Sequence, residues 1–150
     1  DPTIKNYLWM DLVTGMLNAY EKGNDTAILV DENNNITEGP GFNIFCVIGS
    51  EIFTPDHGVL EGITRQTVFD LANELHLSIL KKPISVKELH NADELFATST
   101  AGGIMPITKV SGNQVSNGGV GSITRQLHKL YWVKHTDDGW STSITDITKL

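Results

Sequence analysis

The sequence lacks the features that mark several protein classes. Its 150 residues contain no run of about 18 apolar residues, which is the length that a membrane-spanning helix needs. They contain no cluster of Lys and Arg, and the net charge is −7, so neither a membrane nor a nucleic acid is an expected partner. No P-loop, no G-x-G-x-x-G after a strand and no G-x-S-x-G motif is present. With 39% hydrophobic and 19% charged residues, the composition is that of an ordinary globular domain.

Cysteine and metal-ligand patterns are equally scarce. The single cysteine, Cys46, lies in an apolar run and cannot form an internal disulfide. A buried thiol of this kind suits a reducing compartment, so we expect a cytoplasmic protein. The five histidines show no metal spacing: His128 and His135 are seven residues apart, whereas metal pairs on a helix are usually three or four apart. We therefore expect no metal site.

The apolar pattern predicts an α+β fold. Residues with helical spacing predict helices at about 9–20, 64–75 and from 124, with a short one at 86–91. Short apolar runs bounded by Gly, Pro or Asn predict strands at 27–30, 36–38, 43–48, 51–54, 78–80, 94–98 and 104–110. Hairpins with interspersed helices are typical of α+β domains and not of an alternating doubly wound sheet.

The tetrapeptide Ile-Thr-Arg-Gln occurs at 63–66 and again at 123–126, each time where a helix is predicted to begin. A helix start has free N–H groups and the positive end of the helix dipole, which suits a phosphate. The alternative is plain capping by Thr64 or Thr124, and these local features do not distinguish the two sites. Taken alone, Glu38 beside a Gly-Pro-Gly break and Lys5 near the chain start are typical of solvated charges.

Three segments resemble the class IV (fold type IV) pyridoxal-phosphate aminotransferases: TEGPGFNIF at 37–45, LEGITR at 60–65 and DELFATSTA at 93–101. Residues 1–6 and 99–108 are most similar to the (R)-selective amine transaminases within that class. The resemblance keeps one order from residue 1 to 136. It implies that 1–136 form the C-terminal cofactor-binding domain, in which strand hairpins make a pseudobarrel with surrounding helices. A polar tail at 137–150 would follow.

The resemblance also implies roles around the cofactor, pyridoxal 5'-phosphate. Lys5 matches the lysine that forms a Schiff base with it, a reaction in which a neutral amine is the nucleophile. Glu38 matches the acid that faces the ring nitrogen and favours its protonated form. Leu60 matches the residue packed on the ring, and Trp9 and Ala101 match residues of the substrate pocket.

The phosphate contacts follow in the same way. Ile63 and Thr64 match the helix start that binds the cofactor phosphate, and Thr100 matches a second contact. The resemblance therefore selects Thr64 over Thr124. One position departs from the usual motif, because Pro40 stands where the family normally has a small residue.

The resemblance implies an aminotransferase that moves an amino group between an amine or amino acid, of R or D configuration, and a 2-oxo acid. Two alternatives stay open: a lyase of the aminodeoxychorismate lyase type, and a non-catalytic fragment that retains the fold. Members of the family have a further small N-terminal domain, and we expect this chain to lack it. We therefore expect the isolated chain to be impaired, and the complete protein to be a homodimer.

Overall fold

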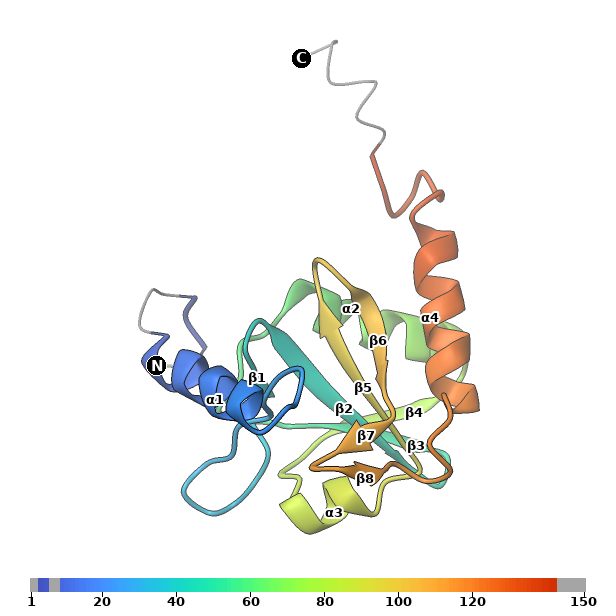
Figure 1. The fold of residues 1–150 in the computed structure, drawn as a ribbon. Helices are drawn as coiled ribbons and strands as arrows, with labels where there is room; N and C mark the ends of the chain where they lie inside the picture. Colours follow the sequence, from blue (N-terminus) through green and yellow to red (C-terminus); the bar gives the residue numbers. More distant parts are fainter. Residues whose placement is uncertain (1–2, 6–8, 143–150) are drawn as a thin grey trace.

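The computed structural model describes residues 3–5 and 9–142, and it confirms the α+β class. Within these residues a six-stranded sheet forms the centre of the molecule, in the order β4-β3-β2-β5-β6 with β1 added to β2 (Figure 1). All neighbouring strands are antiparallel except β3 and β4, which are parallel. The strands are β1 (Glu38–Gly39), β2 (Phe42–Ile48), β3 (Glu51–Thr54), β4 (Ser78–Lys81), β5 (Glu94–Ser99) and β6 (Gly103–Ile107).

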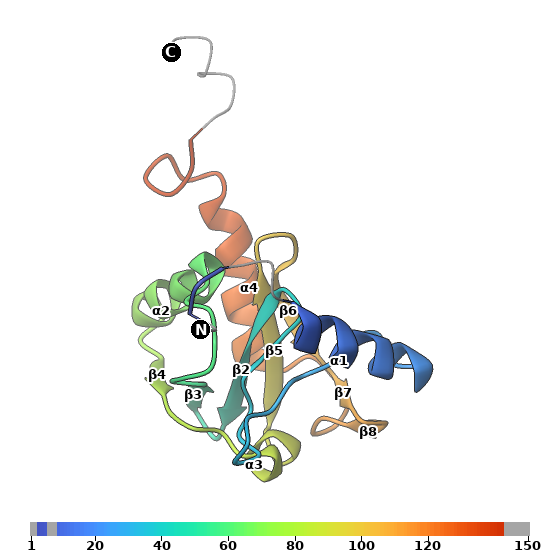
Figure 2. The same ribbon diagram turned by 90° about the vertical axis from the view of Figure 1, so that its left-hand side faces the viewer.

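Helices flank the sheet and are α1 (Met10–Glu21), α2 (Ile63–Glu74), α3 (Val86–His90) and α4 (Ser122–Lys134). Helices α2 and α4 lie together on one face, whereas α1 and α3 lie away from them (Figure 2). A capping box begins α3, in which Ser85 and Glu88 satisfy each other's backbone N–H groups. Among the described residues, no helix is both long enough and apolar enough to cross a membrane.

Alternation along the central strands produces two hydrophobic cores. In β2, Phe45 and Val47 face α2 and α4, whereas Ile44 and Cys46 face the opposite core, which includes Leu89 of α3. The ring of Phe45 stacks on Phe96 of β5 with centroids 4.8 Å apart. Because both faces of β2 and β5 are buried, these strands form a rigid support for the segments at their ends.

The connection from β3 through α2 to β4 positions the candidate site. Since β3 and β4 are parallel, the chain must cross over between them, and α2 makes this crossover on one face of the sheet. The loop 55–62 joins the end of β3 to the first turn of α2. It brings that helix start close to the beginning of β2 and the end of β5, which are paired with each other.

Three of the predicted strands differ from the structure. The segment 36–38 is in a strand only at its last residue, where β1 (Glu38–Gly39) begins. The segment 27–30 is not a buried strand: it makes an isolated bridge from Val30 to Ile36, and Val30 is 46% exposed. The segment 104–110 is divided at Thr108, after which β7 (Lys109–Val110) pairs with β8 (Asn113–Gln114). Positive φ at both residues between them, Ser111 and Gly112, gives the tight turn that a two-residue hairpin favours.

The chain after α4 begins with an ordered turn. The backbone N–H groups of Trp140 and Ser141 both donate to the carbonyl of Asp137, and the Ser141 hydroxyl donates to the His135 carbonyl. The rest of the predicted polar tail, residues 143–150, lies outside the described residues.

Candidate active site

A cavity of about 720 Å³ lies where the start of the chain, β1, the loop 55–62, the first turn of α2 and the end of β5 meet. Its volume is in the range of small-molecule and cofactor sites. Seven of the eight site residues predicted from the resemblance line it: Lys5, Trp9, Glu38, Leu60, Ile63, Thr64 and Thr100. The eighth, Ala101, follows Thr100 in the exposed turn after β5 and is not part of the cavity wall. Residues from four separate sequence segments therefore meet at one site.

Glu38 of β1 lines this cavity, and two hydrogen bonds hold its carboxylate in place. Its Oε2 atom accepts hydrogen bonds from the Leu60 backbone N–H at 3.0 Å and from Nδ2 of Asn43 at 3.1 Å. No described residue bonds the other oxygen, Oε1. Burial raises the pKa of Glu38, while the Leu60 N–H and the positive charge of Arg65 oppose that rise. The carboxylate is thus half-buried, held on one oxygen and available on the other.

Asn43 is a site residue that the sequence analysis missed. It is 5% exposed, and its Nδ2 also donates to the Leu60 carbonyl at 2.9 Å. A β-carbon on Gly62 would collide with the Asn43 amide oxygen, so glycine is required there. The available signal was a polar residue within the apolar run of β2, on the same face as Phe45 and Val47. Asn43 thus joins Glu38 to the loop before α2.

The first turn of α2 is open to the cavity. Its N-cap, Gly62, has extended backbone angles, and among the described residues no side chain accepts a hydrogen bond from the N–H groups of this turn. Ile63 is 85% exposed, whereas Thr64 is 6% exposed, and both line the cavity. Uncapped N–H groups and the positive end of the helix dipole are suited to an anion.

The first turn of α4 carries the second Ile-Thr-Arg-Gln, and its donors are already bonded within the protein. Glu94 of β5 accepts from the backbone N–H of Ile123 at 3.0 Å with Oε1. Its Oε2 accepts from the backbone N–H and the hydroxyl of Thr124, both at 2.7 Å. A carboxylate of the protein therefore occupies this helix end, and Thr124 is not in the cavity wall.

The end of β5 supplies three hydroxyl-bearing residues to the cavity wall. Thr98, Ser99 and Thr100 all line it, and Thr100 lies in the tight turn that leads to β6. The Ser99 hydroxyl accepts from the Gly102 backbone N–H at 3.0 Å, which fixes this turn. The Thr98 hydroxyl is buried and has no hydrogen-bond partner among residues 3–5 and 9–142. An unpartnered buried hydroxyl is costly in a folded protein and marks a place where a polar ligand gains a partner.

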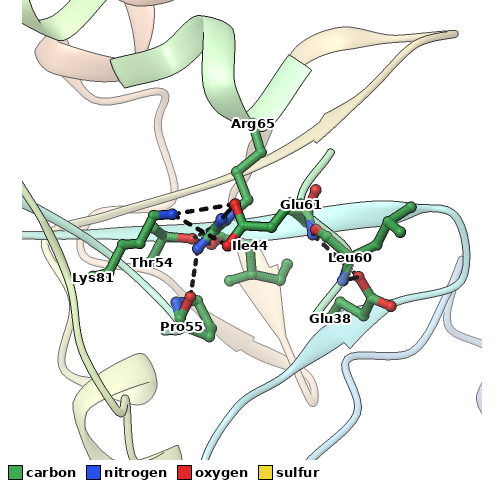
Figure 3. Close-up of polar contacts among 9 residues, drawn as sticks. Glu38, Ile44, Thr54, Pro55, Leu60, Glu61, Arg65 and Lys81 are labelled. Carbon is green, nitrogen blue, oxygen red and sulfur yellow. Dashed lines mark hydrogen bonds and ion pairs between the residues drawn. The ribbon is translucent and has the colours of Figure 1, made fainter. Parts of the chain in front are cut away.

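Arg65 is a second site residue that the sequence analysis did not single out. It is 1% exposed, and its guanidinium donates to the Pro55 carbonyl at 2.6 Å and to the Thr54 hydroxyl at 3.3 Å (Figure 3). It also forms an ion pair with Glu61, whose carboxylate in turn pairs with Lys81 at 3.1 Å. Desolvation lowers the pKa of Arg65, and the charges of Glu61 and Glu38 oppose this.

These donors and acceptors fit the cofactor that the resemblance implies. A phosphate needs N–H and hydroxyl donors, which the open start of α2 and Thr100 supply. A protonated ring nitrogen needs an acceptor, which the free oxygen of Glu38 supplies. The amine of Lys5 lies in the same cavity wall and can bond an aldehyde carbon. Among the described residues, no group of three or more His, Cys, Asp and Glu could hold a metal ion.

Comparison with known proteins identifies the family. Residues 1–110 match the family described as amino-transferase class IV. The chain belongs to the class IV aminotransferases. The branched-chain-amino-acid aminotransferase of Escherichia coli strain K12 is 35% identical over 140 residues, which are 90% of this chain and 45% of that protein.

Solved structures of class IV aminotransferases match in three dimensions as well. The branched-chain aminotransferase of Thermobaculum terrenum in its PLP form has a TM-score of 0.83 and 34% identity, covering 87% of this chain and 44% of that one. The branched-chain aminotransferase of Thermoproteus uzoniensis, solved with norvaline, has a TM-score of 0.83 and 33% identity, covering 89% and 46%. The chain spans about half the length of the curated relatives that it matches.

Proposed function

We propose that this chain is the cofactor-carrying part of a pyridoxal-phosphate-dependent aminotransferase that exchanges an amino group between an amino compound and a 2-oxo acid. The observation that carries the proposal is the gathering of Lys5, Glu38 and the open start of α2 around one cavity. Solved relatives are in the PLP form or in complex with pyridoxamine 5'-phosphate or a phosphopyridoxyl amino acid, which supports the same cofactor here.

Each group of residues has a separate task in this proposal. Pyridoxal phosphate, when bound, supplies an electron-withdrawing ring that stabilises negative charge on a substrate carbon. The first turn of α2 and the Thr100 hydroxyl would hold the phosphate, and Leu60 would pack on the ring. Glu38 would keep a proton on the ring nitrogen, which would strengthen the electron withdrawal. Lys5 would hold the cofactor by condensing its amine with the aldehyde, with release of water. Once the substrate amine has replaced it, the Lys5 amine would move a proton to and from the substrate carbon.

The hydrogen bonds from Leu60 and Asn43 to Glu38 support its proposed task of keeping the ring nitrogen protonated. Burial alone favours the neutral acid, which could not keep a proton on the ring nitrogen. The Leu60 N–H and the Asn43 amide both donate to Oε2 and so favour the ionised form. Their bonds also fix the carboxylate, so that Oε1 is left to face the ring. The same two hydrogen bonds therefore orient the Glu38 carboxylate and favour its ionised form.

A covalent-labelling experiment tests the role of Lys5. The native full-length protein should turn yellow with pyridoxal phosphate, and borohydride should then fix the cofactor to the peptide that contains Lys5. Lys5→Ala should abolish this attachment, whereas Lys22→Ala should leave it unchanged as a control. Mass spectrometry of the digested protein reads the result, and attachment to Lys22 or Lys109 would remove Lys5 from the proposal.

The donor is a finer part of the proposal, and two observations favour different donors. The relatives are named for branched-chain amino acids, which favours an amino-acid donor with a branched aliphatic side chain. The segment Ala101-Gly102-Gly103 resembles the amine transaminases, which favours a donor of R or D configuration. Half-reactions with L-leucine, D-leucine and the two enantiomers of 1-phenylethylamine separate these donors, because only an accepted donor converts the yellow form.

The remaining parts of the proposal concern the whole protein. A domain that precedes Lys5 in the relatives would complete the substrate pocket, and a homodimer would be the active form. The isolated 150-residue chain should therefore retain the cofactor-facing residues and lose most turnover. Release of pyruvate from 4-amino-4-deoxychorismate without any need for a 2-oxo acid would instead favour the lyase alternative.

A further inference from the structure

Arg65 lies in a place that its local sequence does not require. The equivalent arginine of the second tetrapeptide, Arg125, is exposed, and among the described residues its side chain donates to the Val120 carbonyl at 3.1 Å. Arg65 occupies the same position of the tetrapeptide, one residue nearer to the N-cap of its helix, and is 1% exposed. Burying a guanidinium is costly unless hydrogen bonds and a counter-charge compensate for it. The difference between the two arginines therefore points to a task that is particular to α2.

The guanidinium of Arg65 holds both ends of the loop 55–62. One end is bound through the Pro55 carbonyl at 2.6 Å, and the other through the ion pair with Glu61. Its Nε also donates to the Thr54 hydroxyl, which itself donates to the Ile44 carbonyl of β2 at 2.8 Å. The planar fork of arginine can serve several acceptors at once, whereas a lysine ammonium acts as a point charge.

The residue between these two ends contacts the catalytic carboxylate. Leu60 donates its backbone N–H to Glu38 Oε2 (Figure 3). The Leu60 carbonyl accepts from Asn43. A shift of the loop would move this N–H away from Glu38. Because the loop leads directly into α2, the same shift would also move the helix start that carries Thr64. Arg65 is thus connected to both sides of the site through a single loop.

We propose that Arg65 is a positioning residue of the cofactor site, whose buried guanidinium fixes the loop 55–62. The fixed loop directs the Leu60 N–H toward Glu38 and the start of α2 toward the cofactor phosphate. This inference rests on the proposed function. Arg65 acts through its neighbours: its donors bind Thr54, Pro55 and Glu61. Its positive charge also favours the ionised form of Glu38. The other charged residues in the cavity wall are Lys5, Asp11 and Glu61.

Hydrogen exchange of the Leu60 amide in the native full-length protein tests this inference without any cofactor. Arg65→Met removes the fork and the charge, and Arg125→Met is the matched control at the second helix start. We expect Leu60 to exchange roughly tenfold faster or more in Arg65→Met, relative to the core amides of Cys46 and Phe96. Arg125→Met should leave this ratio unchanged. An unchanged ratio in Arg65→Met would overturn the inference, because a purely structural arginine would alter all amides together.

Cofactor affinity supplies the second readout. Pyridoxal phosphate should bind Arg65→Met roughly tenfold more weakly or worse, and Arg125→Met like the wild type. If Arg65→Met does not fold, Arg65→Lys takes its place, because lysine keeps the positive charge and lacks the planar guanidinium. Arg65→Lys should also speed the exchange of the Leu60 amide and weaken cofactor binding. A wild-type protein that binds no pyridoxal phosphate would contradict the proposed function. A wild type that binds it, together with an Arg65 variant that binds equally well, would contradict only this inference.

Discussion

The starts of α2 and α4 share the tetrapeptide Ile-Thr-Arg-Gln, yet only one of them is available to a ligand. At α4, the Glu94 carboxylate bonds the N–H groups of Ile123 and Thr124. At α2, no side chain of the described residues accepts from the first turn, and that turn lines the cavity. The fold places a carboxylate opposite the turn of α4 and the cavity opposite the turn of α2. The shared tetrapeptide alone therefore does not make a helix start a candidate anion site.

The two carboxylates near these helix starts differ in the same way. Glu94 uses both oxygens on protein donors and is 9% exposed. Glu38 uses a single oxygen, Oε2, for both of its protein donors. Both oxygens of Glu94 thus bond the protein, whereas Oε1 of Glu38 is left as an acceptor at the cavity. Substitutions at the two acids should consequently act on different properties.

The largest expected effect is that of Glu38→Gln on turnover. The amide oxygen can replace Oε2 and accept from both Leu60 and Asn43, so the fold should be kept while the charge is lost. Because the interaction with the ring nitrogen is strongest in the transition state, turnover should fall roughly a thousandfold or more, with a small change in cofactor affinity. Steady-state kinetics at saturating cofactor measure this. Near-normal turnover with bound cofactor would remove Glu38 from the mechanism.

The same variant should change how the stability of the cofactor-free protein depends on pH. Burial raises the pKa of Glu38 above its ordinary value of 4.5, so the folded protein holds this proton more tightly than the unfolded chain. Its stabilising contribution is complete below pH 4.5 and is lost as the pH rises through the raised pKa. Glu38→Gln cannot ionise and should therefore unfold at a higher temperature than the wild type at neutral pH. Thermal unfolding across this range should show the advantage vanish below pH 4.5.

The next effect in size is that of Glu94→Ala on stability. The substitution leaves three donors at the start of α4 without their carboxylate partner. Loss of this cap should lower the free energy of unfolding by about 3 kcal/mol, which urea denaturation can measure. Cofactor affinity of the folded fraction should stay at the wild-type value. A weakened cofactor with unchanged stability would mean that the assignment of the two helix starts is reversed.

Much of the fold could be predicted because its signals are local. Apolar residues at helical spacing predicted helices at 9–20 and 64–75, and the structure has them at Met10–Glu21 and Ile63–Glu74. The long apolar runs at 43–48 and 94–98 likewise became β2 and β5, which are buried on both faces. The strand predicted at 27–30 is wrong, since only Val30 makes an isolated bridge there. The strand predicted at 104–110 was right for β6 and missed the division at Thr108, which a two-residue turn after β7 accompanies.

The candidate site could be predicted only through the family resemblance, and only in part. Spacing alone left Thr64 and Thr124 equivalent, because the group that separates them is Glu94, which is 30 residues before Thr124 and reaches it only in the folded chain. Asn43 and Arg65 were missed for the same reason. Their partners, Leu60 and Pro55, lie 17 and 10 residues away and become neighbours through the crossover of α2.

The contrast between the two helix starts is tested most directly by the pyridoxal phosphate affinities of Thr64→Ala and Thr124→Ala, measured side by side in the native full-length protein. Loss of one hydrogen bond to a charged phosphate should weaken binding by roughly ten- to hundredfold in Thr64→Ala. Thr124→Ala should bind the cofactor like the wild type and instead lose stability, because its hydroxyl bonds Glu94 inside the protein. Equal affinities for the two variants would contradict the account.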